Sequence, residues 1–331
     1  MNQTITLANG NGGEENNELI KKVFYKAFKN EILEKNEDAA VLDIKGRIAM
    51  STDSFTVSPL FFSGANIGKL AICGTCNDLA MMGAKPKYMT IGVILEEGFS
   101  VKDLQKIVKS MKSELEINDT IIVSGDTKVM PRGTIDKIIL NTTAIGEIQK
   151  EGISSNNISK EDLILVSRDI GCHGATIFAS REGIELSNNI QSDCKSLYPI
   201  VQKLIDEDIQ ITALRDATRG GVSAVLNEWA KQSNVCIEIS EDKIPVNEEV
   251  KGMSEILGFE AIALANEGTF CLAIKKQDAQ RALEILKEFN DNAVIFGSVS
   301  DKYLQKVILN SAYGTARFLD VPTGELLPRI C

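Results

Sequence analysis

The run Asn77-Asp78-Leu79-Ala80-Met81-Met82-Gly83-Ala84 places one carboxylate inside a stretch of small and apolar residues. Apolar positions recur at helical spacing from Asn66 to Gly83, which predicts a helix there. A strand is expected just beyond it, from Lys87 to Leu95. Because a carboxylate is costly to bury alone, Asp78 is expected to have a partner or a ligand.

Strands and helices alternate on both sides of this run. Before it, a helix is predicted at 19–28 and strands at 39–44 and 47–52; after it, a helix at 101–115 and strands at 120–124 and 135–148. Farther along, strands are predicted at 163–166, 235–239, 269–274, 293–298 and 307–309, and helices at about 195–207, 219–231 and 276–288, with another opened by Gly171. This alternation predicts an α/β or α+β layer structure.

The polar stretch Gly152 to Lys160 is the best candidate domain boundary. A chain of 331 residues suits two domains. We expect an N-terminal α/β domain at 1–150, a C-terminal α/β domain at 151–310 and a flexible tail at 311–331, with a turn at Pro322-Thr323-Gly324. The tail ends in Cys331, and a thiolate on a mobile arm can carry a covalently bound group. An accidental terminal cysteine is the alternative interpretation.

Composition excludes several classes of protein. The net charge of −10 argues against a nucleic-acid binder, whose surface would be basic. No apolar run approaches the roughly 20 residues that span a membrane. The start, Met1-Asn2-Gln3-Thr4, does not resemble a secretory signal. Seven cysteines without framework spacing fit a reducing environment, so a cytoplasmic location is expected.

Four aspartates, Asp38, Asp53, Asp78 and Asp126, fall at strand or loop ends or inside an apolar stretch. Mg²⁺ prefers carboxylate oxygens and commonly shares its coordination with substrate phosphates. Any one of these residues alone is as readily explained as a cap or turn residue. Together they predict a site for Mg²⁺ and a nucleoside triphosphate.

Glycines and cations near these aspartates fit phosphate binding. Gly125-Asp126-Thr127-Lys128 follows a predicted strand, and Lys128 and Arg132 supply positive charge. The Gly12-Gly13 loop permits close approach to a ligand, although a flexible tail is the alternative. No phosphate-binding P-loop and no strong dinucleotide fingerprint is present.

The run Arg215-Asp216-Ala217-Thr218-Arg219-Gly220-Gly221 is a second polar turn before a helix. Its amides and arginines could hold an anion at the helix start. An ordinary helix cap by Thr218 is compatible with that interpretation.

Three further features have both a chemical and a structural interpretation. His173, the only histidine, rules out a multi-histidine metal site and is either a structural hydrogen bonder or a site residue. Glu267 precedes an apolar strand and is either a base or a turn residue. Cys73-Gly74-Thr75-Cys76 has redox or half-zinc spacing but lacks a second pair, so packing is expected.

Several runs together resemble the HypE family of hydrogenase-maturation carbamoyl dehydratases. They are Thr52 to Phe55, Asn77 to Ala84, Gly125 to Lys128, Arg215 to Gly221 and the terminal Pro328-Arg329-Ile330-Cys331. The similarity covers nearly the whole chain, and the terminal motif discriminates best. The wider superfamily includes aminoimidazole ribonucleotide synthetase, selenophosphate synthetase and thiamine-monophosphate kinase, which lack the cysteine arm. The chain departs at Cys172, where the family usually has Asp.

The resemblance implies the following chemistry. A carbamoyltransferase, HypF, places a carbamoyl group on Cys331, and ATP with Mg²⁺ phosphorylates its carboxamide oxygen. Loss of phosphate then leaves a thiocyanate, whose cyanide passes through a HypC–HypD scaffold complex to a nickel–iron hydrogenase. Proton removal is assigned to Glu267 or Lys128 ahead of His173.

The resemblance also implies a site and an assembly. The ATP-binding residues would be Gly12, Gly13, Asp53, Asp78, Gly125, Asp126, Thr127, Lys128, Arg132 and Asp216, with Asp38, Asp53, Asp78 and Asp126 as metal ligands. The N-terminal domain would dimerise through its sheet. Two rivals stay open: a kinase or synthetase acting on a free small molecule, and a non-enzymatic carrier that displays the thiol.

Overall fold

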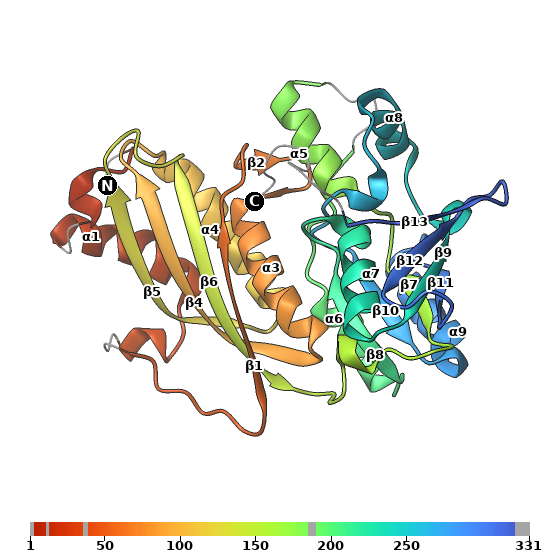
Figure 1. Cartoon of the computed structure of the whole chain (residues 1–331). Coiled ribbons are helices and arrows are strands. Elements are labelled where there is room, and N and C mark those ends of the chain that lie inside the picture. Colours follow the sequence, from red (N-terminus) through yellow and green to blue (C-terminus); the bar gives the residue numbers. More distant parts are fainter. Residues whose placement is uncertain (1–2, 11–12, 36–38, 185–189, 322–331) are drawn as a thin grey trace.

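The computed structural model describes residues 3–10, 13–35, 39–184 and 190–321, which form two α/β units side by side (Figure 1). The first unit is built on a four-stranded sheet with the order β1-β6-β4-β5. Its strands are β1 (Ile48–Phe55), β6 (Ile138–Ile148), β4 (Ala84–Glu96) and β5 (Ile121–Met130). The β4–β5 pair is parallel and the other two pairs are antiparallel.

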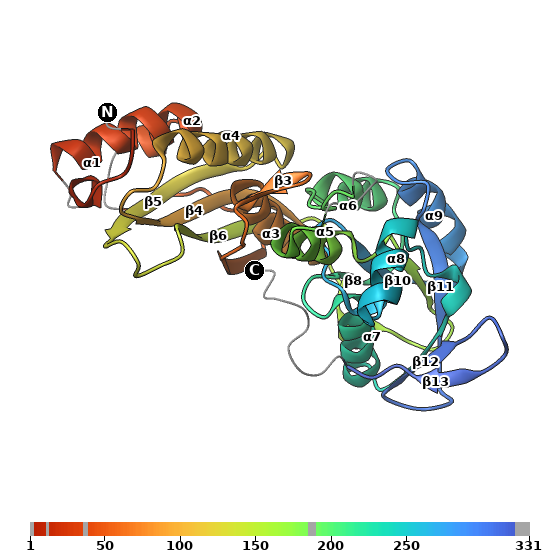
Figure 2. The same cartoon turned by 90° about the horizontal axis from the view of Figure 1, so that it is seen from above.

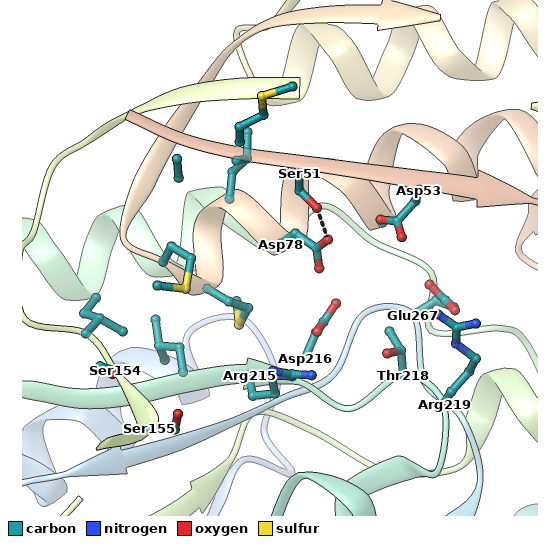
Figure 3. A pocket seen from close by; sticks show the side chains of 18 of the residues that line it. Ser51, Asp53, Asp78, Ser154, Ser155, Arg215, Asp216, Thr218, Arg219 and Glu267 are labelled. Atoms are coloured by element: carbon teal, nitrogen blue, oxygen red, sulfur yellow. Dashed lines mark hydrogen bonds between the residues drawn. The ribbon is translucent and has the colours of Figure 1, made fainter. Parts of the chain in front are cut away.

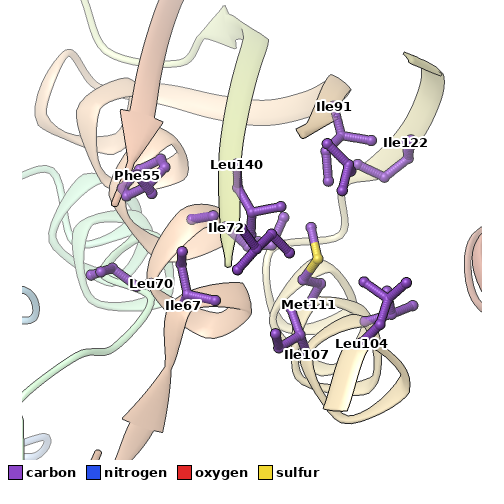
Figure 4. Packing of buried hydrophobic residues seen from close by; sticks show 14 of the residues in the cluster. Phe55, Ile67, Leu70, Ile72, Ile91, Leu104, Ile107, Met111, Ile122 and Leu140 are labelled. Carbon is purple, nitrogen blue, oxygen red and sulfur yellow. The ribbon is translucent and has the colours of Figure 1, made fainter. Parts of the chain in front are cut away.

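Helices cover one face of this sheet. They are α3 (Ile67–Met81), α4 (Val101–Ile117) and an N-terminal helical segment made of α1 (Glu14–Leu19), the π-helical η2 (Ile20–Tyr25) and α2 (Lys26–Phe28). Figure 2 shows α2 and α4 along that face, whereas no helix of the described residues covers the opposite face. Figure 4 shows the core between α3, α4 and the strands, with Leu104, Ile107 and Met111 on the buried side of α4.

Local sequence explains both helices. Ser100 caps α4 by accepting from the Asp103 amide, and an apolar stripe then alternates with exposed lysines. Helix α3 is apolar nearly all round because it is buried on several sides. Gly68 lets it approach α4 closely, since a Cβ there would lie 2.4 Å from the Ile107 carbonyl oxygen.

The second unit is built on a seven-stranded sheet with the order β13-β12-β9-β11-β7-β10-β8. Its strands are β13 (Ala316–Phe318), β12 (Lys306–Asn310), β9 (Cys236–Ser240), β11 (Val294–Ser300), β7 (Leu163–Val166), β10 (Phe270–Ile274) and β8 (Ile211–Asp216). Helices α6 (Tyr198–Asp206) and α9 (Ala279–Lys287) pack on one face and α7 (Gly221–Gln232) on the other. Helices α5 (Cys172–Glu182) and α8 (Glu248–Leu257) share a smaller apolar cluster.

Short elements complete the described chain. They are η1 (Leu7–Gly10), η3 (Leu33–Lys35), β2 (Phe61–Phe62), β3 (Ala65–Asn66), η4 (Ser155–Asn157), η5 (Glu241–Lys243), η6 (Ala261–Ala263) and η7 (Lys276–Asp278). Helix α3 joins the two units, because its end packs Ala80 and Met81 into the α6 and α9 layer. Within the described residues, no helix is long and apolar enough to cross a membrane.

The predicted α/β layers are confirmed, with three differences. The strand expected at 39–44 is wrong: residues 39–44 pair with no strand, and the Val41 side chain is 85% exposed. Strand β8, strand β13 and helix α8 were not predicted. Because Gly314, at φ +81°, closes a turn in which the Ser311 amide donates to Thr315, β13 returns to pair with β12. The expected tail therefore cannot begin at 311, since residues 316–318 belong to the sheet.

Candidate active site

A cavity of about 470 Å³ lies between the two units, lined by four carboxylates. Asp53 comes from β1, Asp78 from α3, Asp216 from the end of β8 and Glu267 from the loop before β10. Figure 3 shows these four side chains turned toward a common space. The two domains thus contribute two carboxylates each.

The N-terminal pair is positioned by strand alternation and by helix burial. Ser51, Asp53 and Phe55 lie on the helix-covered face of β1, because side chains alternate along a strand. Asp78 projects from α3 toward that strand, and the Ser51 hydroxyl donates to its Oδ2 at 2.5 Å (Figure 3). The partner expected for Asp78 is thus a hydroxyl on the neighbouring strand.

The carboxylates raise one another's pKa. Burial, and then the charge of Asp78, raise the pKa of Asp53 to about 6 and that of Asp216 to about 7. The pKa of Glu267 lies well above its usual range, first because of burial and next because of Asp216. This density of negative charge is stabilised by protons or by a cation.

Two arginines of the Arg215–Gly221 turn lie at the cavity. Arg215 pairs with Glu228 at 3.3 Å, while the charge of Arg219 opposes the upward shift of the Asp53 pKa. Gly220, at φ +78°, is the N-cap of α7 without a side-chain cap, so the alternative interpretation of Thr218 as an ordinary helix cap does not hold. Thr218 lines the cavity instead.

A buried network fixes the Glu267 loop. The Asp193 carboxylate accepts from the Gly268 amide at 2.9 Å, the Glu267 amide at 3.1 Å and the Thr269 hydroxyl at 2.7 Å. Gly268 is required here because a Cβ would lie 1.8 Å from the Asp193 carbonyl oxygen. Asn77, next to Asp78, donates to the Lys195 carbonyl at 3.0 Å and accepts from the Leu197 amide at 2.8 Å.

Gly125, Asp126 and Thr127 line a different cavity of about 320 Å³, beside the N-terminal helix. Asp126 is exposed on β5 and pairs with Lys128 at 2.8 Å. Strands β1 and β5 are opposite edges of the sheet, three strand spacings or about 14 Å apart. The Asp53 side chain lies on the helix-covered face of the sheet, whereas the Asp126 side chain lies on the uncovered face. One chain therefore does not bring the predicted ATP-binding residues together.

The remaining predicted residues are dispersed. His173 is fully buried in α5, with Nδ1 2.8 Å from the Ser192 hydroxyl and its ring edge-on to Phe62. Arg132 lines a third pocket next to Gly98, and Gly13 is the N-cap of α1. Gly12, Asp38 and Cys331 lie outside the described residues. Cys73 and Cys76 are buried free thiols, as the packing interpretation predicted.

The chemistry of the four-carboxylate cavity fits Mg²⁺, since the cavity offers hard carboxylate oxygens that repel one another. The described ranges contain no three acidic, histidine or cysteine side chains already arranged to hold a metal ion. Phosphate oxygens and water would have to complete the coordination, which is ordinary for Mg²⁺.

Sequence reasoning missed three residues that build this site. Ser51 lines the cavity, and Asn77 and Asp193 hold its loops. Adjacency to Asp78 was the available signal for Asn77, whereas Arg219 belongs to the turn that the sequence predicted to hold an anion. Asp193 carried no signal, because its partners lie more than 70 residues away.

Comparison with known proteins identifies the family. The model of the AIR synthase related protein N-terminal domain matches residues 36–148, and that of the C-terminal domain matches 159–310. Carbamoyl dehydratase HypE of Escherichia coli K12 is 43% identical, with 99% of each chain covered.

Solved structures agree with this relationship. A hydrogenase maturation protein HypE in complex with ATP superposes with a TM-score of 0.96 at 41% identity, covering 99% of this chain and 100% of the other. A chain of a HypE–HypF complex gives 0.80 at 45% identity, covering 92% and 99%. The chain therefore belongs to the HypE family of carbamoyl dehydratases, within the AIR synthase related proteins.

Proposed function

We propose that this carbamoyl dehydratase acts on a carbamoyl group carried by its own Cys331, with ATP and Mg²⁺, and supplies the cyanide ligand for hydrogenase maturation. The thioester-like S-carbamoyl group is phosphorylated on its carboxamide oxygen, which releases ADP. Loss of that phosphate and of the nitrogen protons leaves an S-cyanate on the cysteine. Phosphorylation turns a poor leaving oxygen into a good one, so inorganic phosphate departs as the carbon–nitrogen triple bond forms.

The observation that carries the proposal is the four-carboxylate cavity between the domains. Asp53, Asp78 and Asp216 would hold Mg²⁺, which neutralises charge on the transferring phosphoryl group. The same negative charge keeps ATP out unless the cation accompanies it. Arg219 at the rim supplies a fixed positive charge toward phosphate oxygens.

Glu267 is proposed to move protons at the carboxamide nitrogen. Its carboxyl group is almost fully buried at the cavity wall, and this burial raises its pKa well above the usual range, which favours the protonated form. Such a group can give a proton to one atom and take one from another as the charge around it changes. Lys128 and His173 are weaker candidates, because neither lines this cavity.

A homodimer formed through the open sheet face would complete the site. Met50, Thr52 and Thr143 lie on that face, where the Met50 side chain is 68% exposed. Asp126 and Lys128 lie on the same uncovered face. Pairing two sheets face to face would bury this surface and present Asp126 and Lys128 of one chain to the partner chain. Because Asp53 lies on the helix-covered face and Asp126 on the open one, ATP bound in such a dimer would have to extend around the sheet edge formed by β1.

Partners are proposed from the family. A solved relative forms a HypE–HypF complex, so HypF is the proposed carbamoyl donor for Cys331. HypC and HypD are the proposed acceptors of the cyanide, in the cytoplasm. We propose no nucleic-acid partner, since the net charge of −10 disfavours binding to a phosphate backbone.

Intact-mass analysis tests the proposal directly. The chain is incubated with HypF, carbamoyl phosphate and ATP–Mg²⁺, beside a Cys331→Ala variant. We expect a carbamoyl adduct that becomes a nitrile adduct only with ATP and only when Cys331 is present. If the variant behaves like the parent chain, the cysteine is incidental and phosphorylation of a free small molecule takes its place.

A further inference from the structure

A separate polar cavity of about 440 Å³ shares no lining residue with the carboxylate cavity. It lies among the start of α3, the end of α4 and the segment that leads into α6. Three cationic side chains line it: Lys69, Arg168 and Lys195. Nothing in the proposed reaction uses them.

The two carboxylates of this cavity are already engaged. Glu114 accepts from the Ser196 hydroxyl at 2.7 Å and pairs with Lys69 at 3.5 Å. Asp193 is occupied by the amides and the hydroxyl of the Glu267 loop. Neither carboxylate forms an ion pair with Arg168 or Lys195 among the described residues, and the three cations of the cavity outnumber its two carboxylates.

Arg168 and Lys195 have no ion pair among the described residues. The Nε atom of Arg168 is buried and has no hydrogen-bond partner there. Lys195 Nζ makes a cation–π contact with Phe289, 5.9 Å from the centre of the ring. Burial, followed by the positive charges of Arg168 and Lys69, lowers the pKa of Lys195. A buried donor and mutually repelling cations are costly without an anion.

We infer that the cavity between Lys69, Arg168 and Lys195 binds a small phosphate-bearing solute. A phosphate group offers several acceptor oxygens, which match the orphaned Nε of Arg168 and the ammonium of Lys195. The apolar wall of Ile117, Pro199 and Phe289 leaves room for the rest of the solute.

Protection of Lys195 from acylation provides a site-specific test. The full chain is treated with acetic anhydride at pH 8 in millimolar inorganic phosphate or in chloride of equal ionic strength, and the modified lysines are mapped by peptide mass analysis. We expect phosphate to slow acetylation of Lys195 at least threefold, because a bound anion keeps the amine protonated. Lys302, exposed and paired with Glu238 at 2.9 Å, is the internal control and is expected to react equally in both salts.

An Arg168→Gln variant separates this site from general ion effects. It is expected to lose the protection at Lys195 while Lys302 stays unchanged, and Arg168→Lys is expected to keep part of it. Equal acetylation of Lys195 in phosphate and chloride in the unmodified protein would overturn the inference, whether or not the variants fold. Protection that persists fully in Arg168→Gln would also overturn it.

Discussion

Ser51 donates a hydrogen bond from its hydroxyl group to a carboxylate oxygen of Asp78 across 2.5 Å, joining β1 to α3 at the edge of the candidate active-site cavity. The bond orients Asp78 for a ligand and satisfies one of its lone pairs. Ser51→Ala is expected to lower kcat/KM for ATP at least tenfold, since a hydrogen bond to a charged group contributes roughly 1.5–3 kcal/mol. Single-turnover ATP cleavage measures this. Ser113→Ala, on the exposed side of α4, is the matched control; equal rates in both variants would contradict the assignment.

Asp216 makes the metal-free protein less stable as pH rises. Its pKa is raised to about 7 in the folded chain, so the folded state binds a proton that the unfolded state releases above its ordinary pKa of 3.8. The resulting cost grows from about pH 4 to pH 7 and then stays constant. Asp216→Asn removes it, so the variant is expected to melt higher than the parent, by more at pH 8 than at pH 5.

Thermal melts in EDTA at the two pH values check this expectation. Asp301→Asn is the control and is expected to lower the melting temperature. The hydrogen bond from Lys160 lowers the pKa of Asp301, so the charged form of this residue stabilises the folded chain. If the melting temperature of Asp216→Asn rises by the same amount at pH 5 and pH 8, burial of the Asp216 charge is not the cause of the rise.

Mg²⁺ at the proposed site would compete with the protons that this cluster holds. Because the pKa of Asp53 is about 6 and that of Asp216 about 7 without metal, binding near pH 6 must displace protons. The affinity for Mg²⁺ with a non-hydrolysable ATP analogue is expected to rise at least tenfold between pH 6 and pH 8. Calorimetry in two buffers of different ionisation enthalpy would report the released protons; a pH-independent affinity without proton release would rule out these carboxylates as ligands.

Sequence periodicity predicted the layers because long apolar elements such as α3, α4 and β4 carry a strong pattern. It missed β8, whose residues before Asp216 are few and mixed, and it predicted a strand at 39–44 that finds no partner strand. The carboxylates Asp53, Asp78 and Asp216 could be named from local motifs. Their separation from Asp126 could not, because it depends on strand order and on which face each side chain occupies.

The uncovered sheet face gives a prediction about assembly. A charged side chain at its centre would have to be buried without a partner if two faces pack together. Thr143→Arg is therefore expected to convert the protein to a monomer in light scattering and to lower ATP turnover by at least tenfold. Thr56→Arg, just beyond β1, is the control for surface charge. A Thr143→Arg variant with the parent's mass and turnover would place the interface elsewhere.

Glu267 is the side chain whose loss should stop dehydration without stopping ATP binding. Gln keeps the shape and the neutrality of the protonated acid, and Asp193 holds the loop through the amides of residues 267 and 268, so the loop stays in place. Loss of a general acid–base group costs about 10²–10⁴ in rate, so Glu267→Gln should form the nitrile on Cys331 at least a hundredfold more slowly at unchanged ATP affinity.

Lys128→Gln is expected to weaken ATP binding instead, and His173→Gln to lower the melting temperature, because that ring is buried. Time-resolved intact mass separates the three outcomes, and nitrile formation at the parent's rate in Glu267→Gln would remove Glu267 from the chemistry.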